Sequence, residues 1–183
     1  KESYLYTADS EGLHTPRLEL SARMVRDFSD VELRHRIAKE CYHIAAGHLH
    51  LEVMTEQLLQ LIKYVPSLPG LSVINMFGGN AAFEAAAFRL RSAAFKWFEH
   101  ATYSAENFAV AYTGDLEAGL SATLTSVLSD RSAWEVLDLT EYLNQIQRIE
   151  ACVGPFEAMD RMDEVHPYGP YRVRNMLRYA ISD

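Results

Sequence analysis

Several features that mark familiar protein classes are scarce or missing in this chain of 183 residues. Cysteine occurs only twice, which is too few for a framework of several disulfides. No apolar run approaches the roughly 18 to 20 residues that a membrane-spanning helix needs. No segment of useful length alternates apolar and polar residues, as a half-buried strand does. These absences exclude a disulfide-stapled domain and a membrane span, and they argue against a β-sheet.

The motifs of several enzyme classes are missing as well. The chain has no glycine-rich nucleotide-binding loop, no Gly-x-Ser-x-Gly sequence and no Cys-x-x-Cys pair. Its net charge of −8 at pH 7 opposes binding to nucleic acid through neutralised phosphates. No basic segment leads into an apolar one, as in a signal peptide. The compartment therefore stays unknown, with the cytoplasm or an organelle interior as the default.

What the chain does contain is helical periodicity bounded by capping and breaking residues. The apolar share of 49% and the charged share of 23% are typical of a globular protein, and we expect residues 1–183 to form one domain. The predicted fold class is all-α: a helical bundle built on two long antiparallel helices, at about residues 31–64 and 80–113, with three to four shorter helices. An extended arm is expected at residues 1–15, and a Tyr/Arg-rich segment forms the C-terminus, residues 165–183.

Two capping boxes help to place the helix starts. Ser29 and Glu32 have the spacing in which the serine hydroxyl accepts from the third amide and the glutamate reaches back. This box predicts the start of the first long helix. Ser132 and Glu135 have the same spacing and predict the start of a helix that ends near Cys152.

Three single residues carry further structural expectations. Asp115 follows a glycine and is expected to be the N-cap of a shorter helix. Gly119, inside that helix, permits close contact with another helix because it has no side chain. Cys41 has apolar neighbours, which predicts a core position.

The two long helices differ in how their apolar residues are distributed. In the 80–113 helix, alanines alternate with Phe and Trp on one wide face, a pattern that lets another helix approach closely. In the 31–64 helix, apolar residues cover about two thirds of the circumference, which is more than one covered face needs. We expect part of this apolar surface to be left for a partner. The alternative is that the N-terminal arm and the terminal helix cover it.

Histidines supply the clearest candidate chemistry, since four of the seven lie between residues 35 and 50. Glu40 and His43 have the Glu-x-x-His spacing with which di-iron helical bundles bind metal, and His50 lies two turns beyond His43. Glu99 and Glu106 on the second long helix add carboxylates. The second Glu-x-x-His pair that such bundles carry on a facing helix is missing. The candidate metal ligands are Glu40, His43, His50, Glu99 and Glu106, and the metal would be iron or manganese.

A simpler interpretation of the same helix is a solvated polar face. A third interpretation is a pH-sensitive contact surface, because clustered histidines titrate near neutrality. The polar stripe consists of Glu32, Arg36, Lys39, Glu40, His43 and His50.

Arg36 and His43 also have an Arg-x6-His spacing, which resembles the motif of HEPN ribonucleases, a family of helical bundles. The resemblance covers these two residues. It implies that Arg36 and His43 would stabilise and protonate a cleaved phosphodiester, usually across a dimer. Ile37 stands where that motif has a polar residue, and the acidic chain opposes an RNA substrate.

The C-terminal segment combines tyrosine and arginine, the residue types that are enriched in interface hot spots. Its arginines can equally pair with the chain's own acidic surface. The residues concerned are Tyr168, Tyr171, Tyr179, Arg172, Arg174 and Arg178.

The sequence as a whole favours a non-catalytic interaction or assembly protein: a complex subunit, an adaptor or a homo-oligomer. A protein partner or a second copy is expected, without a cofactor, nucleic acid or membrane span. The first alternative is a metal-dependent oxidase-type bundle that uses iron or manganese. The second alternative is a HEPN-like ribonuclease.

Overall fold

The computed structural model describes residues 18–65, 79–152 and 169–182, and all regular structure in these ranges is helical. The all-α fold class is therefore confirmed. The predicted arm at residues 1–15 and the first residues of the C-terminal segment lie outside the described ranges. The helices are α1 (Ala22–Asp27), α2 (Asp30–Ala45), α3 (His48–Tyr64), α5 (Gly79–Thr113), α6 (Leu116–Leu128), α7 (Ser132–Val136), α8 (Leu139–Cys152) and α10 (Gly169–Ala180).

One continuous helix over residues 31–64 was a wrong prediction, because the chain breaks between α2 and α3. Gly47 lies in the left-handed region with a φ of 71°, a conformation that glycine adopts without the strain of a Cβ. The amide of Ala46 donates to the carbonyl of Tyr42 at 2.8 Å and ends α2 there. The second long helix is continuous, and α5 matches its predicted range closely.

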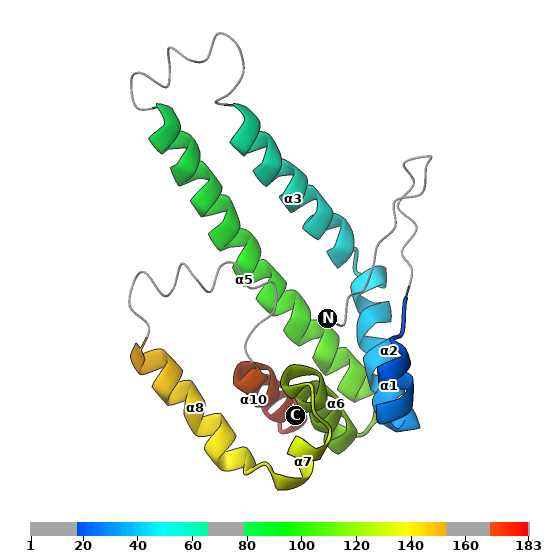
Figure 1. Ribbon diagram of the computed structural model, residues 1–183. Coiled ribbons are helices and arrows are strands. Elements are labelled where there is room, and N and C mark those ends of the chain that lie inside the picture. The colour runs from blue at the N-terminus through cyan, green and yellow to red at the C-terminus, as the bar shows by residue number, and fades with distance from the viewer. Residues whose placement is uncertain (1–17, 66–78, 153–168, 183) are drawn as a thin grey trace.

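The helices form a broad base from which a two-helix arm projects (Figure 1). In the arm, α3 runs antiparallel beside the N-terminal half of α5. The C-terminal half of α5 continues into the base, where α2, α6 and α10 pack against it. α8 packs against α10.

The apolar core lies in the base. Large side chains of α5, α6, α8 and α10 meet there, among them Leu124 and Met176, which are completely buried. A smaller cluster joins Met24 and Phe28, around α1, to Ala122 of α6. No side chain of α3 is buried. The base therefore contains the core, whereas the arm is a thin pair of helices.

The first capping box is confirmed, and the second is not. Ser29 accepts from the amide of Glu32, whose carboxylate accepts from the amide of Ser29. Ser132 makes no such bond, and its hydroxyl instead donates to the carboxylate of Asp130 at 2.8 Å. The predicted helix to residue 152 is divided into α7 and α8, and Asp138 caps α8 by accepting from the amides of its first turn.

Candidate functional site

Four residues of the polar stripe, Glu32, Arg36, Lys39 and Glu40, are buried in the base and expose at most 8% of their surface, so the interpretation as a solvated face was wrong for them. Of the other two, His43 is half-buried and His50 is exposed. His35, which lies beside the stripe, is buried as well. The reason is that α5 and α6 pack against this helix and bring polar partners with them. Cys41, on the same helix, is exposed and unpaired instead of belonging to the core as predicted.

The central feature of this region is an ion pair between α5 and α10, two helices that are far apart in sequence. Glu106 of α5 is completely buried, and its Oε1 accepts from Nε of Arg172 on α10 at 2.6 Å. The Nη2 of Arg172 contacts the same oxygen. On α2, Nζ of Lys39 lies 3.7 Å from Oε1 of Glu40. The name "buried ionic cluster" is used below for His35, Arg36, Lys39, Glu40, Glu106 and Arg172.

Charges within the buried ionic cluster shift one another's pKa values. Burial acts to raise the pKa of the Glu106 carboxyl, but Arg172, Lys39 and Arg36 outweigh it, and the pKa falls below its ordinary value. Burial, reinforced by Arg36 and Arg172, lowers the pKa of Lys39 to about 8. The cluster thus holds Glu106 ionised and favours the loss of a proton from Lys39.

His35 is the neutral member of the cluster. It exposes 1% of its surface, and burial lowers its pKa to about 4, so the imidazole is uncharged at pH 7. Neither ring nitrogen has a hydrogen-bond partner among the described residues. The ring packs against Gly119 of α6, where a Cβ would lie 2.8 Å from the His35 Cε1. The expected close approach at Gly119 is therefore confirmed, and so is the N-cap at Asp115.

Glu32 lies one turn before His35 and fastens α2 to α6. Its Oε1 accepts from the Ser121 hydroxyl at 2.5 Å, and its Oε2 accepts from Nη1 of Arg131 at 2.7 Å. Burial acts to raise the pKa of Glu32, but its bonds from Ser121, Ser29 and Arg131 lower it overall. Glu32 therefore has a structural role, because its hydrogen bonds hold α2 against α6.

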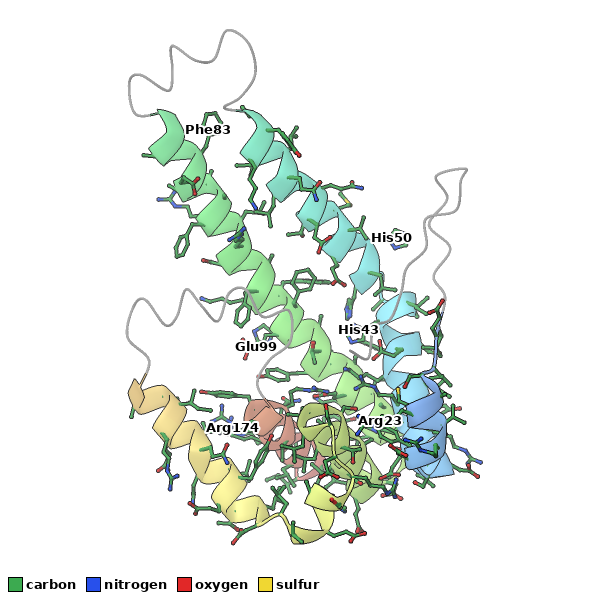
Figure 2. All side chains as sticks on the ribbon, viewed as in Figure 1. Arg23, His43, His50, Phe83, Glu99 and Arg174 are labelled. Atoms are coloured by element: carbon green, nitrogen blue, oxygen red, sulfur yellow. The ribbon has the colours of Figure 1, made fainter. Side chains whose placement is uncertain are left out.

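The five predicted metal ligands lie in different surroundings. Glu40 and Glu106 belong to the buried ionic cluster, while Glu99 accepts from the Tyr103 hydroxyl at 2.7 Å. Nδ1 of His43 lies 3.0 Å from Nδ1 of His48, and His50 is exposed on α3. In Figure 2, His50 projects from the outer side of α3, whereas His43 points into the junction of α2 and α3.

No group of three His, Cys, Asp or Glu side chains that could hold a metal ion occurs in the described ranges. The iron or manganese site stays a prediction from the sequence. Of its residues, Glu106 already faces a guanidinium and Glu40 an ammonium group.

The two residues of the HEPN-like spacing have different environments. Arg36 is buried within the ionic cluster, whereas His43 is half-buried and contacts His48. Their proposed roles on a phosphodiester stay a prediction.

Sequence reasoning missed an aromatic and imidazole cluster at the break between α2 and α3. The His48 ring centroid lies 5.1 Å from that of Trp97 on α5, and the Tyr42 centroid lies 5.0 Å from that of Phe108. Burial lowers the pKa of His48. These ring contacts hold the first residue of α3 against α5, at the point where the arm begins. The sequence signal for this site was Gly47, the residue at which the helix breaks.

The arm carries a second candidate surface, because α3 presents large apolar side chains to solvent. Leu51 is 44% exposed, Met54 63%, Leu58 47% and Leu61 58%. These four residues are called the leucine row. They follow one another at intervals of three, four and three residues, the spacing of core positions in a coiled coil. The expectation of uncovered apolar surface on this part of the chain is thus confirmed.

The Tyr/Arg segment docks in part onto its own chain. Arg172 is buried against Glu106, and Nη1 of Arg174 lies 3.8 Å from Oε1 of Glu150. Arg174 also lies over the Tyr171 ring, 4.9 Å from its centroid. Arg172 and Arg174 therefore pair with acidic residues of their own chain, which was the alternative to an interface.

Comparison with family models, with characterised proteins and with solved structures finds no match to this chain. Among the described residues, no helix combines the length and the apolar character that crossing a membrane requires. The leucine row and the buried ionic cluster are therefore the features of this chain that bear on its function.

Proposed function

We propose that this chain is a non-catalytic interaction protein that binds a protein partner through the leucine row of α3. The observation that carries the proposal is the exposure of four large apolar side chains at coiled-coil spacing on one helix. A contiguous apolar surface on a soluble domain commonly marks a binding site.

The leucine row offers apolar surface whose burial would favour a complex. Each member of the leucine row exposes about half of its surface, between 44% and 63%. At about 25 cal/mol per Å², covering each one stabilises a complex by roughly 1–2 kcal/mol. The row is already ordered on a helix, so binding does not require α3 to fold first.

The buried ionic cluster supports a non-catalytic role. The carboxylates that a metal enzyme would use face cations of the same chain, Glu106 with Arg172 and Glu40 with Lys39. The Glu106–Arg172 pair joins α5 to α10, whereas the Glu40–Lys39 pair lies within α2. They support a structural role for the polar stripe and leave the arm as the surface for binding.

The proposal is tested by comparing Leu58→Glu with Gln60→Glu. Both substitutions add one carboxylate to an exposed position of α3, but residue 60 lies on the polar side of the helix. Immobilised wild-type protein and Gln60→Glu should retain the same partner from the native extract, whether another protein or a second copy. Leu58→Glu should lose it while keeping its helical circular dichroism. Equal retention by all three proteins would contradict the proposal.

A further inference from the structure

The arm carries a second exposed row beside the leucine row. Ala82, Ala86 and Ala93 of α5 are exposed and share one side of that helix, since they fall within about 40° on a wheel of 100° per residue. They are called the alanine row.

The two rows lie on the same side of the arm. Figure 2 shows Phe83 between the two helices and His50 on the outer side of α3, which fixes how each helix is rotated. With these rotations, wheels of 100° per residue turn the alanine row, Leu51 and Leu58 toward the far side of the arm in this view. Met54 and Leu61 point between that side and the outer side of α3. A ridge of Leu and Met therefore runs beside a strip of alanine.

From this arrangement we infer that the partner is a second copy of this chain, with the two arms packed as a four-helix bundle. The inference rests on the proposed function and names the occupant of the leucine row. Each leucine row packs on the alanine row of the other copy, about a two-fold axis parallel to the helices. Such a contact is isologous, because the same patch serves both copies.

The register of the two rows favours a second copy. His48 is level with Trp97, since their ring centroids are 5.1 Å apart. Because α3 and α5 are antiparallel, each step forward along α3 matches one step back along α5. Leu51 is then level with Ala94, one residue from Ala93, and Leu58 is level with Ala87, one residue from Ala86. A two-fold axis parallel to the helices keeps these levels, so Leu51 and Leu58 face the alanine row across the interface.

Charge favours the same occupant and the same axis. The chain carries a net charge of −8, so two copies repel except where charges are few. Neither row contains a charged residue. Arg89 and Lys96 border the alanine row on the wheel. Arg89 is about level with Gln57 at the uncharged edge of the partner's α3, and Lys96 is about level with His50 at the same edge. A two-fold axis perpendicular to the helices would instead bring Arg89 and Lys96 close to the same two cations of the second copy.

The size of the patch sets the strength of the contact. The 17 residues of α3 form a helix about 25 Å long, and two neighbouring helices are about 20 Å wide. The patch therefore covers about 500 Å² on each copy, which totals about 1,000 Å², the lower end for a specific complex. We expect a reversible dimer with a Kd in the micromolar range.

Sedimentation velocity of the purified full chain, from about 1 to 500 μM, tests the inference with two matched pairs of variants. Leu58→Glu and Ala86→Gln alter the two rows, and Gln60→Glu and Ala81→Gln make the same changes at exposed positions outside them. Circular dichroism verifies that all four variants are folded. Wild type and the two controls should show the same monomer–dimer equilibrium. Each row variant should raise Kd by roughly 100-fold, because each substitution enters the interface twice.

Gln57→Glu tests the direction of the axis. It places a carboxylate beside Arg89 of the partner copy, and Kd should fall about twofold to fivefold. A wild-type chain that stays monomeric at the highest concentration overturns the inference. A dimer that both row variants leave unchanged overturns it as well. Loss of another protein from Leu58→Glu in the capture experiment, with a monomeric wild type, leaves the proposed function standing and excludes the second copy.

Discussion

The contact between α2 and α6 is tested most sharply by Gly119→Ala. A Cβ at residue 119 would lie 2.8 Å from Cε1 of His35, 3.1 Å from its Nδ1 and 3.3 Å from Cγ2 of Val110. The imidazole exposes only 1% of its surface, so it cannot turn toward solvent unless α2 moves. The new methyl group therefore strains the packing of α2 on α6.

Two effects of this substitution oppose each other. In a helix interior, alanine is favoured over glycine by about 1 kcal/mol. Forcing an extra carbon into a packed interior costs about 1–3 kcal/mol. Since the neighbour is a buried ring on a packed helix, we expect the steric cost to prevail. The net loss of stability is about 1 kcal/mol and at most about 2 kcal/mol, and each kcal/mol lowers Tm by roughly 2–4 °C in a chain of this size.

A double-mutant cycle separates the two effects. Thermal and urea unfolding are measured for the wild type, Gly119→Ala, His35→Ala and the double variant. Without the imidazole, Gly119→Ala should increase stability by about 1 kcal/mol, because only the gain in helix propensity remains. An increase in the Tm of the otherwise wild-type protein would refute the reasoning. An equal effect of Gly119→Ala in both backgrounds would refute it too.

Three further predictions concern the base. The pKa of His35 is about 4 when folded, against an ordinary value of 6.5, so the unfolded chain binds more protons between these values. Stability is then greatest above pH 6.5 and falls toward pH 4, by on the order of 3 kcal/mol. The free energy of unfolding is measured in urea at pH 7, 6 and 5. His35→Gln should remove most of this loss of stability, and His50→Gln should not. If His35→Gln leaves the dependence of the unfolding free energy on pH unchanged, the assignment of this dependence to His35 is contradicted. Glu106→Leu should cost about 3–5 kcal/mol, because it leaves Arg172 buried without its carboxylate. Lys39→Met should cost less than about 1 kcal/mol in the same assay, since the cluster still contains Arg36 and Arg172, and equal costs would argue against this account. Elemental analysis of protein purified without chelator should find no stoichiometric iron or manganese, whereas one equivalent that Glu40→Ala removes would support the metal enzyme.

Local signals in the sequence predicted the features that depend on neighbouring residues. The capping box at Ser29, the N-cap at Asp115 and the continuous α5 all follow from contacts within a few positions, and all are confirmed. The failure at Ser132 is also local. Asp130 accepts from both the amide and the hydroxyl of Ser132, so the serine side chain is held by its neighbour instead of capping the helix.

The buried ionic cluster could not be predicted in this way. A stripe with Arg36, Lys39 and Glu40 looks solvated until a helix elsewhere in the chain supplies counter-charges. Arg172 and Glu106, which form the central ion pair, are separated by 66 positions in sequence. Periodicity along one helix gives no information about such a partner. Gly119 was a local sign that another helix comes close to α6.

The base and the arm are stabilised by different interactions, and this difference bears on how the arm functions. Charge pairs and a buried core fix the helices of the base, whereas α3 has no buried side chain. An isolated helix of 17 residues is marginal in water, so α3 depends on its contact with α5. An apolar partner on the leucine row would cover a second side of α3 and stabilise it where the chain itself does not. The leucine row leaves the arm a weak part of the monomer, and a partner that covered this row would strengthen it.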